Sequence, residues 1–252
     1  MPRTIVFLHA HPDDEAIFTG GTMARLADRG VRVVLVVATS GELGAINDST
    51  DPHRLPEQRR YETDLAADAL GIDRVVFLGY RDSGLPGDPA NDAPGSFFAA
   101  DTEEVAREVA AILREEEAEA IVVYDAGGIY GHPDHVQVHR VGVRAAALAD
   151  VATVYQATVD REYLHFVETH LVDHAGASVP GLPTIGVPSV LVTTMVDVRS
   201  HLDVKRAAIA AHASQVPETS SAMTMPHATF ADVYGFEWYV RNGPAGIIDE
   251  LT

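Results

Sequence analysis

Two short segments of this chain concentrate the residue types that bind metals and transfer protons. Residues 9–18 read HAHPDDEAIF, and residues 129–135 read IYGHPDH. Each segment follows an apolar run of the kind that forms a buried strand. Histidines and carboxylates gathered where a buried strand ends indicate a metal site or acid–base chemistry.

The lack of cysteine limits the ligands that such a site could use. With no thiolate in the sequence, a metal must be held by histidine and carboxylate side chains. Two imidazoles and one carboxylate from these turns would supply three ligands and leave a fourth position for water, as in catalytic zinc sites. The other carboxylate of the pair Asp13 and Asp14 could then take a proton from that water, whose pKa a metal lowers to about 7.

Either segment alone is also typical of an ordinary turn, in which Pro and Asp form the turn and His lies on the surface. The two together are harder to explain in this way, because both follow predicted strands. Two acidic turns brought close to each other would repel unless a cation lay between them. We therefore interpret the two segments as halves of one metal site.

The elements that must position these segments alternate between strands and helices. Strands are predicted at 4–10, 31–39, 74–80, 120–126 and 189–198. Helices are predicted at 15–30, 55–71, 101–119, 127–150 (after a glycine turn) and 199–215. After residue 155 the pattern is weaker. This alternation predicts an α/β fold, a Rossmann-like and mostly parallel sheet with helices on both faces.

In such a sheet, ligands bind outside the carboxyl ends of the strands. Both His-Pro-Asp segments follow predicted strands, so the fold would bring them to the same edge. Residues 81–100 form a long loop rich in Gly, Pro and Asp, which we expect to be a wall or lid of the pocket.

Composition predicts a globular chain and limits its partners. The 252 residues, 46% hydrophobic and 22% charged, fit a single domain over residues 1–252. A net charge of −19 argues against nucleic acid and anionic membranes, which need a positive surface. With no leader-like start and no membrane-length apolar run, we expect a cytoplasmic protein without membrane insertion, acting on a small molecule. A homo-oligomer is compatible with the sequence.

The two segments also carry a resemblance to a known family. AHPDDE (10–15) together with YGHPDH (130–135) resembles the PIG-L/LmbE family of zinc-dependent N-deacetylases, which act on N-acetylglucosamine conjugates and related amides. Supporting matches occur at TSGELG (39–44), Arg59-x-x-Glu62, GYRDSGLPG (79–87) and AAHASQ (210–215). The stretch YRDSG is similar to the actinobacterial branch, which includes the mycothiol deacetylase and the mycothiol-conjugate amidase.

The resemblance implies a ligand set and a base. Zinc, or ferrous iron as the native metal, would be bound by His11, Asp14 and His135. Asp13 would act as the general base. These roles agree with the chemistry, since amide hydrolysis needs an activated nucleophile, an oxyanion stabiliser and a proton donor for the leaving amine.

The resemblance also implies roles for the neighbouring residues. His132 would be the general acid or hold the developing oxyanion, oriented by Asp134, and Tyr130 would lend its hydroxyl to the oxyanion. Arg59 and Asp82 match positions that grip sugar hydroxyls in relatives. His132 lies three residues before His135 at a helix start, so the two share a face.

Three positions depart from the mycothiol enzymes. Ala45 stands where the mycothiol deacetylase carries an acidic residue, and Ala16 and Phe18 follow HPDDE where those enzymes favour small polar residues. These departures favour a substrate other than the mycothiol precursor.

Several other residues have simpler interpretations. His9 is expected to be a packed core histidine, and Gly20-Gly21 to allow close helix packing. His139 has ligand spacing after His135 on a helix, although Asp14 is preferred as the third ligand. His212 would either close over the pocket or end a helix.

Three functions are compatible with these residues and motifs. The leading prediction is a zinc hydrolase that removes acetyl from an N-acetylglucosamine-type amino sugar or its conjugate. The alternatives are an amidase that cleaves a mycothiol S-conjugate or a similar amide, and a non-catalytic Rossmann-like module that binds a sugar or nucleotide. Asp13 argues against the module, because a binding protein has no need of a base beside its ligands.

Overall fold

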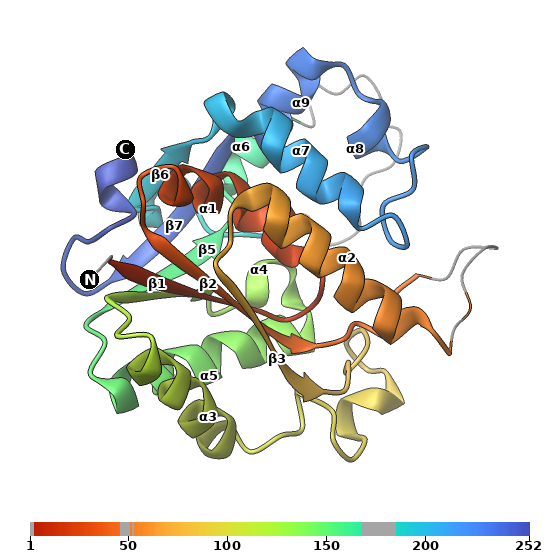
Figure 1. Cartoon of the computed structure of the whole chain (residues 1–252), viewed down its shortest axis with the longest axis vertical. Helices are drawn as coiled ribbons and strands as arrows, with labels where there is room; N and C mark the ends of the chain where they lie inside the picture. Colours follow the sequence, from red (N-terminus) through yellow and green to blue (C-terminus); the bar gives the residue numbers. More distant parts are fainter. Residues whose placement is uncertain (1–2, 46–50, 52, 168–184) are drawn as a thin grey trace.

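A central sheet organises the protein (Figure 1). The computed structural model describes residues 3–45, 51, 53–167 and 185–252. Within these ranges the strand order is β3-β2-β1-β4-β5-β7-β6. The strands are β1 (Thr4–His9), β2 (Arg32–Thr39), β3 (Arg74–Tyr80), β4 (Ala120–Tyr124), β5 (Thr153–Thr158), β6 (Thr194–Asp197) and β7 (Phe236–Asn242).

Strands β1 to β5 run parallel, and β7 lies antiparallel between β5 and β6. This confirms the predicted mostly parallel sheet. Strands β5 and β7 were not predicted, because buried polar residues such as Gln156 and Glu237 interrupt their apolar pattern. The predicted strand at 189–198 is shorter, because Ser189–Leu191 form a 3₁₀ turn before β6.

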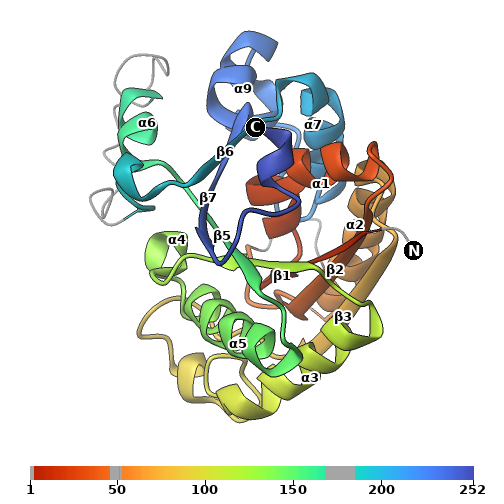
Figure 2. The same cartoon turned by 90° about the vertical axis from the view of Figure 1, so that its left-hand side faces the viewer.

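Helices cover both faces of the sheet, as predicted (Figures 1 and 2). The helices are α1 (Gly20–Ala27), α2 (Leu55–Leu70), α3 (Thr102–Glu115), the short turn α4 (Gly128–Gly131), α5 (Pro133–Ala149), α6 (Arg161–Phe166), α7 (Leu202–Ala211), α8 (Ser221–Thr224) and α9 (His227–Tyr234). Helices α3 and α5 lie together on one face, and α1, α2 and α7 lie on the other. None of the helices in the described ranges is long and apolar enough to cross a bilayer.

Local sequence explains how the helices begin and end. The Asp101 side chain accepts hydrogen bonds from the backbone N–H groups of Glu103 and Glu104, which starts α3. Gly71 ends α2 in the left-handed conformation. The predicted helix at 15–30 is divided, because a π-helical turn over Glu15–Thr19 precedes α1.

The strand order places a topological switch between β1 and β4. From β1 the chain moves outward to β2 and β3 on one side, whereas β4 and β5 lie on the other side. The loops that follow β1 and β4 therefore diverge at the sheet's carboxyl edge, which is where open α/β sheets bind ligands. The first His-Pro-Asp segment lies in the loop after β1, and the second joins the loop after β4 to the start of α5.

Candidate metal centre and active site

Three predicted ligands meet between the loops after β1 and β4. Asp14 Oδ2 lies 3.3 Å from His11 Nδ1 and 3.3 Å from His135 Nε2. The two imidazole rings are 5.4 Å apart between centroids. All three side chains are buried. The structure thus brings together the residues that the resemblance implied.

The spacing of these atoms fits a metal ion. Tetrahedral zinc with bonds of about 2.0–2.1 Å places neighbouring ligand atoms about 3.3–3.4 Å apart. The two separations from Asp14 Oδ2, both 3.3 Å, match this edge length. Two imidazole nitrogens and one carboxylate oxygen are also ligands that zinc and ferrous iron accept. His11 and His135 also form a group of possible donors with His132, since one ligand atom from each of these three histidines lies within 4.8 Å of the others.

Local contacts position the candidate ligands in each of the two segments, after β1 and after β4. After β1, the backbone N–H of His11 donates to Asp14 Oδ2 at 2.8 Å, which turns the carboxylate back toward the His11 ring. After β4, His132 is the N-cap of α5 and Pro133 is its first residue. His135 therefore lies in the first turn of α5, facing the β1 loop.

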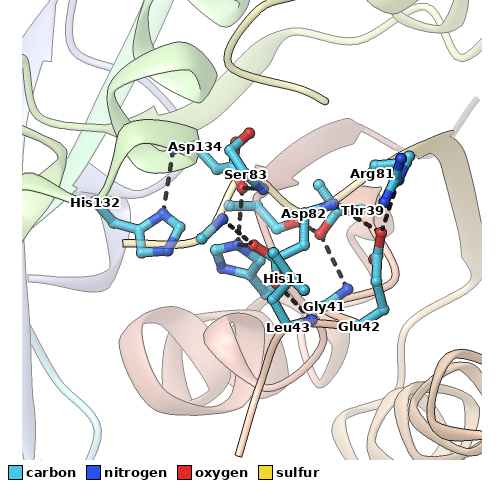
Figure 3. Close-up of polar contacts among 12 residues, drawn as sticks. His11, Thr39, Gly41, Glu42, Leu43, Arg81, Asp82, Ser83, His132 and Asp134 are labelled. Atoms are coloured by element: carbon cyan, nitrogen blue, oxygen red, sulfur yellow. Dashed lines mark hydrogen bonds and ion pairs between the residues drawn. The ribbon is translucent and has the colours of Figure 1, made fainter. Parts of the chain in front are cut away.

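The contacts of Asp134 differ from the expected arrangement (Figure 3). Its Oδ2 lies 3.2 Å from His11 Nε2, and its carboxylate accepts hydrogen bonds from Ser83 N at 2.9 Å and Ser83 Oγ at 2.5 Å. Only its backbone N–H reaches His132, donating to Nδ1 at 3.2 Å. The carboxylate thus orients the candidate ligand His11 rather than His132, and the backbone amide orients His132. Ser83 was not predicted, although it lies within the YRDSG stretch.

The charges around His11 favour a cation at this position. Burial lowers the pKa of His11, but the hydrogen bonds to Asp134 and Asp14 outweigh burial and raise it to about 10. Burial, with His11 and His135 nearby, instead lowers the pKa of His132 to about 4. His132 is therefore neutral at pH 7. Since its Nδ1 accepts the Asp134 N–H, its proton lies on Nε2.

Asp13 lies on the pocket wall in an unusual backbone conformation. Its φ is 106°, in the region that favours glycine. Its backbone N–H donates to Glu15 Oε2 at 3.0 Å, and Arg59 Nη2 donates to its Oδ2 at 3.1 Å. Burial raises the pKa of the Asp13 carboxyl to about 7, although the Arg59 guanidinium opposes this shift.

Arg59 and Asp82 both line the pocket, and both form hydrogen bonds with neighbouring backbone groups. Arg59 is buried and donates to the carbonyl oxygens of Gly41 and Pro12. Asp82 accepts from Gly84 N at 2.8 Å and from Leu43 N at 3.3 Å, and its Oδ1 lies 3.7 Å from His11 Nε2 (Figure 3).

The pocket above the cluster has a volume of about 540 Å³. Residues from the loop 81–100 form part of its wall, as predicted, and Asp82 faces it. Its rim carries exposed apolar side chains, Leu43 and Leu85. Tyr130 also lines it, with its hydroxyl 3.4 Å from His135 Nε2.

His9 and His139 lie away from the pocket. His9 is buried and pairs with Tyr124 Oη at 2.7 Å and Thr19 Oγ1 at 2.8 Å, which confirms a packed core histidine; burial lowers its pKa to about 4. His139 contacts the backbone oxygen of Tyr124 instead of the ligand cluster. Close packing at Gly20-Gly21 is confirmed, since a Cβ on Gly21 would lie 2.4 Å from Val198 Cβ.

His212 ends a helix, which is one of its two interpretations from the sequence, and it does not close over the pocket. It ends α7, is fully buried and pairs with Glu15 Oε1 at 2.6 Å. Burial lowers its pKa, but the attraction of Glu15 outweighs burial and raises it.

Comparison with known proteins agrees with this site. The family model described as PIG-L: GlcNAc-PI de-N-acetylase matches residues 6–146, a range that contains both His-Pro-Asp segments. The chain belongs to the PIG-L family. Membership in this de-N-acetylase family confirms the predicted class of enzyme, a hydrolase of N-acetyl groups.

Two similar PIG-L relatives carry the same name. A protein of Thermomonospora curvata named 1D-myo-inositol 2-acetamido-2-deoxy-alpha-D-glucopyranoside deacetylase is 41% identical, over 97% of this chain and 92% of its own length. A protein of the same name from Thermobifida fusca is 37% identical, over 99% of this chain and 98% of its own length.

Solved structures share the PIG-L fold at low identity. The N,N'-diacetylchitobiose deacetylase from Pyrococcus horikoshii has a TM-score of 0.66 at 22% identity, over 96% of this chain and 84% of its own. The 4-carboxy-2-hydroxymuconate hydratase GalB from Pseudomonas putida has a TM-score of 0.61 at 17% identity, over 97% of this chain and 98% of its own. A hydratase and a deacetylase share this fold, so the site must decide the activity.

Proposed function

We propose that this PIG-L chain removes the acetyl group from an N-acetylglucosamine unit joined to a polyol such as 1D-myo-inositol. The observation that carries the proposal is the buried group of His11, Asp14 and His135 beside a pocket that His11, Asp13 and Asp14 line. The names of the full-length relatives support the substrate. This proposal replaces our expectation from Ala45, Ala16 and Phe18 that the substrate differs from the mycothiol precursor.

A divalent metal would be held by His11 Nδ1, Asp14 Oδ2 and His135 Nε2, with zinc the first candidate and ferrous iron the second. When bound, the metal would supply Lewis acidity toward water and toward the acetamide carbonyl. Asp134 would hold the His11 ring in orientation through Nε2, as carboxylates beside metal-binding histidines commonly do.

Asp13 would act as the base that takes a proton from the attacking water. Its carboxylate lines the pocket, and Arg59 holds one of its oxygens. A carboxyl whose pKa burial raises to about 7 is matched to proton transfer at neutral pH. The proton taken from water would then pass from Asp13 to the departing amine, so that acetate and the free amine leave.

His132 and Tyr130 would stabilise the developing oxyanion. Because His132 is neutral and carries its proton on Nε2, it offers an N–H donor rather than an acid. The Tyr130 hydroxyl lies 3.4 Å from His135 Nε2, and Tyr130 and His132 both line the pocket. Asp82 and Arg59 remain our candidates for contacts to the sugar hydroxyls, since both line the pocket.

Amine release by the purified protein supplied with zinc tests this proposal. We expect release from N-acetylglucosaminyl-inositol, with about one metal bound per chain. Release from a bulky amide such as a mycothiol S-conjugate, but not from the acetylated sugar, would establish the amidase alternative. Metal binding or sugar binding without release from either substrate would indicate the non-catalytic module.

A further inference from the structure

Glu15 and His212 form a buried pair directly behind the Asp13 turn. Glu15 lies in the π-helical turn after β1, and His212 ends α7, 197 residues later in the chain. His212 Nε2 lies 2.6 Å from Glu15 Oε1. Both side chains are 0% exposed, so neither can touch a substrate.

The second oxygen of Glu15 connects this pair to Asp13. Glu15 Oε2 accepts the backbone N–H of Asp13 at 3.0 Å. With a φ of 106°, Asp13 adopts a conformation that is strained for a non-glycine residue and must be maintained by its surroundings. Arg59 provides a second restraint, because it bonds the carbonyl of Pro12 and the carboxylate of Asp13.

His212 gives the buried Glu15 carboxylate a hydrogen-bonding partner and fixes its position. A lone carboxylate in the interior would be costly, whereas a hydrogen-bonded partner offsets that cost. His212 thus supports the bond through which Glu15 holds Asp13.

We propose that Glu15 and His212 are positioning residues, which hold the Asp13 carboxylate in place for proton transfer. The inference rests on the proposed function, in which Asp13 is the base. Proton transfer depends steeply on geometry, and a displacement of about 1 Å can cost about 10²-fold in rate. Because the pair acts on the base, its loss should lower kcat and leave KM and metal binding unchanged.

Two polar substitutions of His212 separate positioning from bulk structure. His212→Gln places an amide N–H near the position of Nε2, within reach of Glu15, whereas His212→Asn places it near Nδ1, out of reach. We expect His212→Asn to lower kcat by about 10–10²-fold and His212→Gln by less than about threefold. KM should stay within about twofold, and metal content should stay near one per chain, for both variants.

A second buried pair provides the matched control. Lys205 Nζ lies 2.6 Å from Glu237 Oε1, both side chains are buried, and Glu237 holds the backbone of Gly21 and Thr22 at the start of α1. Lys205→Met should lower the melting temperature without changing kcat. The inference is overturned if both His212 variants keep wild-type kcat, if both lose it equally, or if metal content falls in parallel with kcat.

Asp13→Asn measured beside these variants separates the catalytic role of Asp13 from the positioning role of the pair. A wild-type rate in Asp13→Asn would reject Asp13 as the base and with it the proposed function. A slow Asp13→Asn together with unchanged His212 variants would reject the positioning role alone.

Discussion

At the scale of single residues, environment separates side chains that the sequence makes look alike. Asp13 and Asp14 are neighbours of the same type. Asp14 is buried with one oxygen between two imidazoles, whereas Asp13 lies on the pocket wall with Arg59 on its carboxylate. The left-handed φ of Asp13 turns the two carboxylates in different directions. One is placed to hold a metal and the other to move a proton.

Asp14→Ala and Asp13→Asn should therefore fail in different ways. Asp14→Ala removes a charged ligand, so we expect the metal affinity to fall by about 10-fold or more. Asp13→Asn leaves the three candidate ligands intact, so metal content should stay near one while kcat falls by about 10²–10⁴-fold. Metal analysis and kcat on both variants check this. If Asp13→Asn lost the metal while Asp14→Ala kept it, Asp13 would be the ligand and Asp14 the base.

Ser83 should influence metal binding without touching the metal. Its hydroxyl and backbone N–H both donate to the Asp134 carboxylate, which orients His11. We expect Ser83→Ala to weaken zinc affinity by about 10-fold, at the lower end for residues that orient a ligand. Zinc titration checks this.

Ser96→Ala is the matched control for Ser83→Ala. Ser96 lies in the same loop, is also buried, and donates to the backbone oxygen of Asn91 rather than to the cluster. Equal zinc affinities in the two variants would contradict the role of Ser83.

At the scale of elements, the start of α5 and the glycine turn before it present the histidines. His132 caps the helix and His135 occupies its first turn, so one helix start supplies two imidazoles. The turn at α4 packs tightly beneath them. Gly128 has a φ of 65°, and a Cβ there would lie 2.8 Å from both His135 Cβ and Val136 N.

Gly128→Ala should therefore displace His135. The new Cβ would strain the backbone by about 1 kcal/mol and also push against the first turn of α5. We expect a lower melting temperature together with weaker zinc binding, measured by thermal unfolding and zinc titration.

Gly30→Ala is the control for Gly128→Ala. Gly30 has a φ of 73° but nothing within 4 Å of its added Cβ. It should show the backbone strain alone, with wild-type zinc affinity. If Gly128→Ala also kept wild-type affinity, the contact with α5 would not set the position of His135.

At the scale of the whole molecule, the sheet gathers loops from distant parts of the chain at one edge. The loops after β1, β2, β3 and β4 all contribute to the pocket. Strand β7, from the C-terminal part, pairs with β5 and extends the same sheet. This continuity supports our proposal of one domain over residues 1–252.

Metal binding should stabilise the whole fold, because the ligands come from opposite sides of the topological switch. A metal at 100 times its Kd adds about 2.7 kcal/mol to the free energy of unfolding. For a chain of this size that corresponds to a rise in Tm of about 5–10 °C. Thermal unfolding with zinc and with a chelator checks this. In Asp14→Ala the difference in Tm between zinc and chelator should be much smaller. A Tm difference equal to that of the wild type would mean that the metal binds elsewhere.

Local pattern was sufficient to predict the alternating elements and the two His-Pro-Asp turns. Apolar runs predict strands, and parallel strands share one carboxyl edge, so the sequence alone could place His11 and His135 together. The cap at Asp101 and the end at Gly71 are equally local. Strands β5 and β7 were not predicted, because their buried polar residues have partners elsewhere in the fold. A short window of sequence does not contain those partners.

Only the tertiary structure decided which partners support the site. Asp134 looked like a companion of His132, two residues away, but its carboxylate contacts His11, 123 residues away, and Ser83, 51 residues away. Glu15 and His212 meet across 197 residues. Such contacts depend on how helices and loops pack against the sheet, and no spacing within one segment encodes them. The sequence by itself therefore determined the chemistry available, and the packing of the chain decided which group orients which.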